Sequence, residues 1–248
     1  MFSKPRYIQN SFNVVFPRQR TIRRIANDFE DRLRGRYFQP QIISIPDELD
    51  PEFPRMIFGS EHGFSQIIVS QVSFVLNVTY SPDWQTDISK GKEYLNERIA
   101  ILFSLLDLLD EARPFFCGLS TKIHLASTED DKAILTQIAK TFFKNKDVKN
   151  ISEIQFKRTE VVSDRFFSNI TINNYRTWKI DGGQQGILSL SSKEASERGI
   201  EIVGDFNDRY NFNEDKKYRS EMDVAKKVID GGLREVKKVA DMLGGESA

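Results

Sequence analysis

Residues 54–80, with the sequence PRMIFGSEHGFSQIIVSQVSFVLNVTY, contain a glycine-flanked turn followed by a long run of alternating side chains. Apart from the polar Gln66 and Ser70, one face of this run holds Phe64, Ile68, Val72, Phe74, Leu76, Val78 and Tyr80. A period of two residues is typical of an antiparallel strand with one buried face. A single strand over residues 64–80 would span about 50 Å. We therefore expect a bend, a bulge or two strands that meet near Gln71 and Val72, with residues 56–59 as the hairpin partner.

The rest of the chain predicts an order of strands and helices that occurs twice. The first half contains a strand at 7–16, a helix at 21–35, strands at 39–45, 55–59 and 64–80, and a long helix at 89–111. The second half contains a strand at 115–127, a helix at 129–143, strands at 151–157, 165–179, 186–192 and 199–206, and a helix at 220–243. We expect an α+β fold, mainly an antiparallel sheet backed by long helices. The predicted halves are residues 1–113 and 114–248, and one continuous domain is the alternative.

The composition of the chain limits the kinds of partner and of functional site that it can have. The 248 residues carry a formal net charge of zero and 29% of them are charged, so global electrostatics predicts neither a nucleic-acid nor a membrane partner. The single cysteine, Cys117, excludes a disulfide within the chain and a cysteine-rich metal site. No apolar run approaches the roughly 18 residues that span a bilayer, and the first residues contain no signal-peptide core. We predict a cytoplasmic protein without membrane contact.

Four short motifs carry a family resemblance. They are Ile-Pro-Asp-Glu from residue 45, Pro-Arg-Met-Ile-Phe-Gly-Ser-Glu-His-Gly from residue 54, Gln-Ile-Ile-Val-Ser-Gln from residue 66 and Asn-Val-Thr-Tyr from residue 77. Over residues 40–105 the chain resembles a family of uncharacterised, sporadically distributed bacterial proteins with a Pro-Arg-x-x-Phe-x-Ser-x-x-Gly signature. The resemblance implies no activity, because none is assigned to that family. It implies an association with mobile or anti-phage gene cassettes.

Few residues are candidates for chemistry. His62, in the turn after residue 59, could act as a base or contact a ligand, while His124 is expected on the wet face of a strand. The spacing of the histidines and the cysteine predicts no metal site, and we expect no cofactor. Asp205 and Asp208, at the end of a predicted strand, could support a metal-dependent hydrolase or nuclease.

The arginines of the first 40 residues are candidates for binding. This segment contains nine Lys or Arg residues and three acidic ones. Arg20, Arg23 and Arg24 lie off the apolar stripe of the predicted helix and could contact nucleic acid. Alternatively, this helix face is solvated and pairs with the acidic loop at 47–52. Arg55 either binds turn carbonyls and a carboxylate such as Asp47 or Glu61, or contacts a ligand directly.

The sequence contains no catalytic set of nucleophile, base and orienting group. We predict a non-catalytic binding or assembly component of a bacterial multi-protein system, with a protein partner and with an anti-phage or mobile cassette as its context. The alternatives are a nucleic-acid-binding accessory that uses the N-terminal arginines, and a metal-dependent hydrolase or nuclease around Asp205 and Asp208.

Overall fold

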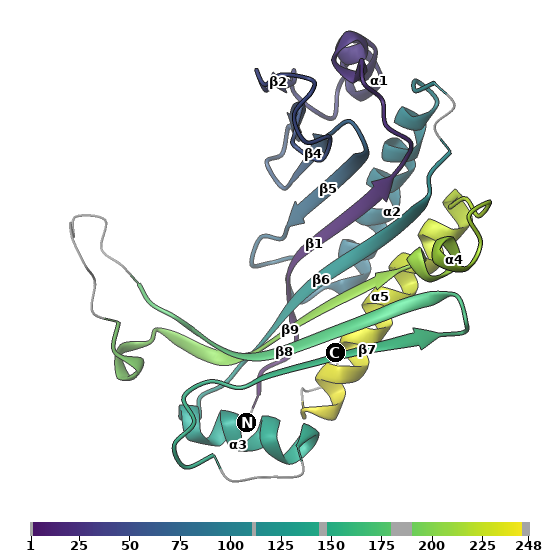
Figure 1. Cartoon of the computed structure of the whole chain (residues 1–248). Coiled ribbons are helices and arrows are strands. Elements are labelled where there is room, and N and C mark those ends of the chain that lie inside the picture. The colour runs from purple at the N-terminus through teal and green to yellow at the C-terminus, as the bar shows by residue number, and fades with distance from the viewer. Residues whose placement is uncertain (1, 111–112, 144–147, 180–189, 245–248) are drawn as a thin grey trace.

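The computed structural model of the chain describes residues 2–110, 113–143, 148–179 and 190–244. It is an α+β fold with a single nine-stranded sheet in which every neighbouring pair of strands is antiparallel (Figure 1). The strand order is β2-β3-β4-β5-β1-β6-β9-β8-β7. The bounds are β1 Arg6–Val15, β2 Gln41–Ile42, β3 Met56–Gly59, β4 Ser65–Val69, β5 Ser73–Thr79, β6 Phe116–Ala126, β7 Gln155–Val162, β8 Phe166–Thr177 and β9 Glu197–Asn207.

The run at 64–80 forms two strands, as expected. They meet at a turn in which the Ser70 hydroxyl accepts hydrogen bonds from the backbone N–H groups of Val72 and Ser73, at 3.1 and 2.9 Å. The predicted grouping of side chains was wrong for β4, because this turn resets the alternation. Ile67 is buried on the same side as Leu76, whereas Ile68 points to the opposite side.

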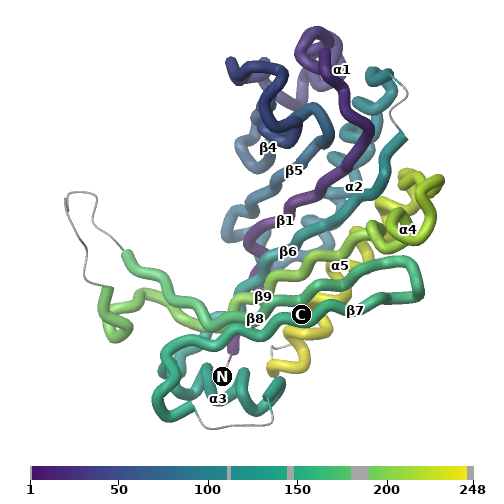
Figure 2. Tube along the Cα trace, viewed as in Figure 1, coloured from purple at the N-terminus to yellow at the C-terminus, as the bar shows by residue number. Residues whose placement is uncertain are grey.

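The helices lie mainly on one side of the sheet. Figure 2 shows α2 and α5 behind the sheet, where α5 packs on β6 and β9, and α2 packs on β5 and on α5. We call this side the covered face and the other side the open face. The helices are a 3₁₀ helix at Ile22–Ile25, α1 Ala26–Leu33, α2 Ile88–Leu106, α3 Asp131–Phe142, a 3₁₀ helix at Ser192–Glu194, α4 Arg209–Glu214 and α5 Met222–Met242.

The core extends across the predicted boundary between residues 113 and 114. β1 and β6 pair with each other at the centre of the sheet, and one cluster of buried side chains continues from Phe12 and Leu76 to Leu119 and Val236. None of the helices in the described ranges is long and apolar enough to cross a membrane.

Three predicted strands differ from the structure. The strand expected at 151–157 is β7, which begins at Gln155 and continues to Val162, because its antiparallel pairing with β8 extends to Phe166. The strand expected at 39–45 is limited to Gln41–Ile42, because Pro40 and Pro46 cannot donate backbone hydrogen bonds and so restrict pairing. The strand expected at 186–192 is not found where it can be checked: residues 186–189 lie outside the described ranges, and a 3₁₀ helix begins at Ser192.

Candidate functional site

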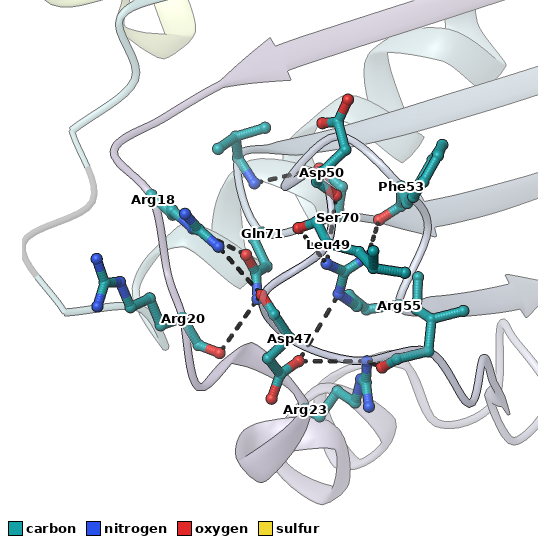
Figure 3. A network of polar contacts seen from close by, with 12 residues as sticks. Arg18, Arg20, Arg23, Asp47, Leu49, Asp50, Phe53, Arg55, Ser70 and Gln71 are labelled. Atoms are coloured by element: carbon teal, nitrogen blue, oxygen red, sulfur yellow. Dashed lines mark hydrogen bonds and ion pairs between the residues drawn. The ribbon is translucent and has the colours of Figure 1, made fainter.

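Arg55 lies in the interior of the protein (Figure 3). Its side chain is 0% exposed, and its terminal nitrogens donate to the carbonyl of Phe53 at 2.9 Å and to those of Leu49 and Asp50, both at 3.3 Å. The Nε atom lies 3.8 Å from the Asp47 carboxylate. Burial and the nearby Arg23 lower the pKa of Arg55. These contacts hold the loop at 47–53 against the start of β3.

Further polar contacts fasten the same loop to the N-terminal segment. The amide of the buried Gln71 accepts from Arg18 Nε at 2.9 Å and donates to the Asp47 carbonyl at 3.1 Å (Figure 3). Arg23 forms an ion pair with the Asp47 carboxylate at 3.2 Å. Arg18, Arg23 and Arg55 therefore converge on the acidic loop, and among the three candidate arginines of the predicted helix face only Arg23 pairs with it.

The remaining candidate binding residues do not join this network through their side chains. Arg20 and Arg24 are exposed, and their guanidinium groups make no hydrogen bond or ion pair with any described residue. His62 is also exposed, in the turn between β3 and β4, which is at the opposite end of β3 from Arg55. The structure thus brings together Arg23 and Arg55 but separates them from His62.

The two candidate acidic residues occupy different environments. Asp208 is fully buried, and its carboxylate accepts from the Cys117 backbone N–H at 2.6 Å and from the Tyr218 hydroxyl at 2.7 Å. Burial raises the pKa of Asp208 and also that of the Cys117 thiol. Asp205 instead lies on the open face. No three His, Cys, Asp or Glu side chains in the described ranges are grouped so that they could hold a metal ion.

The open face carries a row of polar side chains across the middle of the sheet. Cross-strand pairing places Gln66 of β4 beside Asn77 of β5, Asn77 beside Ser11 of β1, and Ser11 beside Ser120 of β6. The row continues to Asp205 of β9, Asn169 of β8 and Thr159 of β7. With strands about 4.8 Å apart, this central row spans about 29 Å.

One half of the open face is uncharged and its side chains are not engaged by the protein. We call this half, over β4, β5, β1 and β6, the neutral patch. Its members are amides and hydroxyls that make no side-chain hydrogen bond with any described residue: Gln9, Ser11, Asn13, Gln66, Asn77, Thr79 and Ser120. The Oδ1 atom of Asn13 is buried and has no hydrogen-bond partner within the described structure. The neutral patch therefore offers donors and acceptors in excess of what the fold uses.

Two hollows lie on this half of the face. One, of about 350 Å³, lies over β3 to β1 and is lined by Gln66, Asn77 and the partly exposed residue Phe64, whose ring stacks on Trp84 with 6.1 Å between the ring centroids. The other, of about 230 Å³, extends from the neutral patch to β9 and is lined by Ser11, Asn13, Phe116, Gly118, Ser120, Asp205, Asn207 and the exposed Arg209. Gly118 is required there, because a Cβ atom at this position would lie 2.9 Å from the Cβ of Asn207.

The other half of the open face is charged but internally paired. Glu201 lies 3.2 Å from His124 Nε2 and 3.3 Å from Lys122 Nζ, and hydrogen bonding from His124 with the charge of Lys122 lowers the pKa of Glu201 to about 2. Arg6 pairs with Glu197 at 2.5 Å. These pairs leave the charged half with little unbalanced charge.

The amide side chains around Asp205 are also bonded to neighbouring groups of the protein. Asn169 and Asn207 donate to the Asp205 carboxylate at 3.0 and 3.1 Å, and Thr159 donates to Asn169 at 2.8 Å. A metal-dependent hydrolase built on Asp205 and Asp208 would need both carboxylates at one site. Instead, Asp205 is held by surface amides and Asp208 by buried groups.

Sequence reasoning did not find the neutral patch. Its signal is that most outward positions of β1, β4 and β5 are amides and hydroxyls, where lysine and glutamate would be ordinary; Ile68 and Val75 are apolar exceptions. The strand order, which brings residues 11, 66, 77 and 120 into one row, is not visible in the sequence. Comparison of the chain with models of known protein families and with curated proteins finds no match.

Proposed function

We propose that this protein is a non-catalytic binding component that holds a protein partner on the neutral patch. The observation that supports the proposal is a continuous set of uncharged amide and hydroxyl side chains that form no side-chain hydrogen bond with any residue that the structure describes. An amide both donates and accepts hydrogen bonds, as the peptide groups of a polypeptide do. Such a surface can therefore pair with main-chain and neutral side-chain groups of another protein.

The two hollows support the same proposal, because each is bordered by an aromatic residue. Phe64 borders the first hollow and Phe116 the second. Protein interfaces combine a few apolar anchors in pockets with surrounding polar contacts. Apolar side chains of the partner would enter the hollows, while its polar groups contact the amides between them.

Charge supports a protein over a nucleic acid as the partner on this face. Nucleic-acid binding depends on unpaired lysine and arginine residues that neutralise phosphates. The side chains that form the neutral patch include none, and Lys122 and Arg6 beside it are paired with Glu201 and Glu197. Arg209, which borders the second hollow, lies over the ring of Phe116, 5.4 Å from its centroid. The exposed Arg20 and Arg24 lie on the N-terminal segment, so a nucleic-acid partner would bind a different part of the protein.

The proposal is tested by affinity capture from extracts of the source cells. The variant Ser11→Arg with Gln66→Arg places charge and bulk in both hollows, and Ser89→Arg with Thr128→Arg adds the same charge at exposed positions on the other elements. We expect wild type and the second variant to capture the same protein, and the first variant to lose it while its melting temperature stays within a few degrees of wild type.

Two results would contradict the proposal. One is an identical set of captured proteins with all three chains. The other is captured nucleic acid that is lost after nuclease treatment and in Arg20→Ala with Arg24→Ala, which would favour the nucleic-acid-binding alternative. The family resemblance adds the expectation that the captured protein belongs to a bacterial multi-protein system.

We also propose that the two halves of the chain are similar units. The strand order supports this: β3, β4 and β5 form a meander whose last strand pairs with β1, and β7, β8 and β9 form a meander whose last strand pairs with β6. In each half a helix precedes the meander and a long helix, α2 or α5, follows it. An open face shared by two such halves could contact a partner with two equivalent segments.

A further inference from the structure

The two edges of the sheet differ in how available they are for pairing. At one edge, β2 consists of two residues and is flanked by Pro40 and Pro46. Proline and short length are devices that protect an edge strand from pairing with another chain. At the other edge, β7 has eight residues without proline, and β8 is the only strand that pairs with it in the described structure (Figure 1). The β7 edge therefore presents unpaired backbone groups.

Comparison of the two halves shows the same difference between a covered and an uncovered edge. In the first half, the outer strand of the meander, β3, is covered by β2. In the second half, β7 occupies the corresponding position, and no strand of the described residues covers it. A place for one more strand is thus present at this edge.

We propose that the added strand is β7 of a second copy of this chain, paired antiparallel across a two-fold axis at Thr159. A two-fold axis perpendicular to the sheet makes the interface self-complementary. It also keeps the two open faces on the same side, so the pair would form one sheet with a continuous open face. This inference does not depend on the proposed function.

The charges of β7 select this register. With the axis at Thr159, Arg158 of each copy lies opposite Glu160 of the other, which gives two reciprocal ion pairs. Cross-strand pairs of opposite charge stabilise a sheet, whereas like charges opposite one another destabilise it. An axis at Lys157, Arg158 or Glu160 would place that residue opposite its own copy, and so would oppose like charges.

The side chain of Arg158 is already positioned for such a contact. Within one copy its guanidinium lies 3.3 Å from the Glu160 carboxylate, and its Nε atom is buried without a hydrogen-bond partner in the described structure. Pairing would bring a second carboxylate beside the guanidinium. The result is a network of four alternating charges at the axis.

Pairing in this register would also bury apolar side chains on and beside β7. Phe156 would lie opposite Val162 of the second copy, on the covered face. Phe156 stacks on Phe142 at 4.8 Å and contacts Phe143, which is 39% exposed, at 5.9 Å between ring centroids. The added strand would lie beside these rings. On the open face, Val161, which is 44% exposed, would contact the aliphatic stem of Lys157 of the second copy.

Charge reversal tests the proposal in solution. We expect sedimentation of the wild-type chain over a range of concentrations to show a monomer–dimer equilibrium. Arg158→Glu and Glu160→Arg should each weaken the dimer by about tenfold or more, since each opposes like charges twice. The double variant Arg158→Glu with Glu160→Arg should restore it. Glu93→Arg, an exposed reversal on α2, is the control and should leave the dimer unchanged.

Disulfide trapping tests the register itself. Thr159→Cys places two thiols opposite each other with Cα atoms about 4.5–5.5 Å apart, within the range that a disulfide bridges. We expect it to form a covalent dimer on mild oxidation, while the buried Cys117 stays reduced. Gln155→Cys, at an equally exposed position of β7, should not, because the two copies of residue 155 would lie about 27 Å apart.

A wild-type chain that stays monomeric at all concentrations would overturn the proposal. So would a dimer that is insensitive to both single reversals, or one in which Gln155→Cys is trapped as readily as Thr159→Cys.

Discussion

The side chain of Arg55 is enclosed by the loop that it stabilises. All three of its hydrogen bonds are made to carbonyl groups of residues 49–53, and its Nε atom faces Asp47. A guanidinium suits this position because its five donors point in fixed directions within one plane. The neighbouring Arg24 shows the contrast, since its side chain is exposed and unpaired among the described residues.

We predict that Arg55→Ala lowers the free energy of unfolding by about 3–5 kcal/mol, because three loop carbonyl groups lose hydrogen bonds from a charged, buried donor. The carbonyl groups of Leu49, Asp50 and Phe53 would lose their donor. Arg24→Ala is the matched control and should change stability by less than about 0.5 kcal/mol. Urea unfolding followed by circular dichroism measures both. Equal small effects of the two substitutions would contradict the role assigned to Arg55.

Several residues of the signature have roles that sequence spacing alone suggests. Gly63 adopts a φ of +72°, which favours glycine in the turn between β3 and β4. The Ser60 hydroxyl accepts from the backbone N–H of Ser65 at 3.0 Å and closes that turn. The turn itself was therefore predictable. For Arg55, the sequence predicted only that its partners are turn carbonyls or a carboxylate such as Asp47 or Glu61. Which of these groups it contacts depends on how the loop at 47–53 folds back.

Among the elements, α5 and β9 approach each other unusually closely. A Cβ atom at Gly204 of β9 would lie 2.3 Å from Cγ1 of Val236 on α5, and a Cβ atom at Gly231 of α5 would lie 2.4 Å from the ring of Phe206. The strand and the helix therefore each carry a glycine at the contact. This close approach fixes the position of α5 on the covered face.

We predict that Gly204→Ala lowers the free energy of unfolding by about 1–3 kcal/mol, because the added methyl group overpacks the contact with Val236. Gly59→Ala in β3 is the control: its Cβ would have no neighbour within 4 Å. It should change stability by less than about 0.5 kcal/mol. Thermal unfolding of both variants provides the measurement. If Gly204→Ala is as stable as Gly59→Ala, α5 can shift away from β9 at little cost.

The elements also show where periodicity is informative. The alternation at 116–126 predicted β6 within one residue at each end, because the whole strand has one buried face. The phase of β4 was wrong, because hydrophobicity alone does not show that the turn at 70–72 changes which residues face the core. The predicted length of the edge strand β2 was too great. The apolar residues between Pro40 and Pro46 suggested more strand pairing than the two prolines permit.

At the scale of the whole molecule, one sheet joins the two halves of the chain. β1 and β6 pair along their length at its centre, and α2 of the first half packs on α5 of the second. Separation of the halves would expose both the edge of a central strand and an apolar helix interface. The halves should therefore lose their structure together.

We predict a single cooperative unfolding transition for the chain at one protein concentration. In the variant Trp178→Phe, fluorescence reports on Trp84 alone, which packs against Phe64 and Tyr94 in the first half. Far-UV circular dichroism reports on helices of both halves. The two probes should give coincident urea transitions, and separate midpoints would show that the halves unfold independently.

The sequence by itself determined the α+β class, the approximate position of most strands and helices, and the turn before β4. These follow from local periodicity, proline and glycine, which act over a few residues along the chain. Only the tertiary structure decided which strands are neighbours, and thereby which side chains share a surface. The neutral patch combines side chains of β1, β4, β5 and β6, and the edge at β7 is free because β8 alone among the described strands pairs with it. Both depend on contacts between distant segments, which no local pattern encodes.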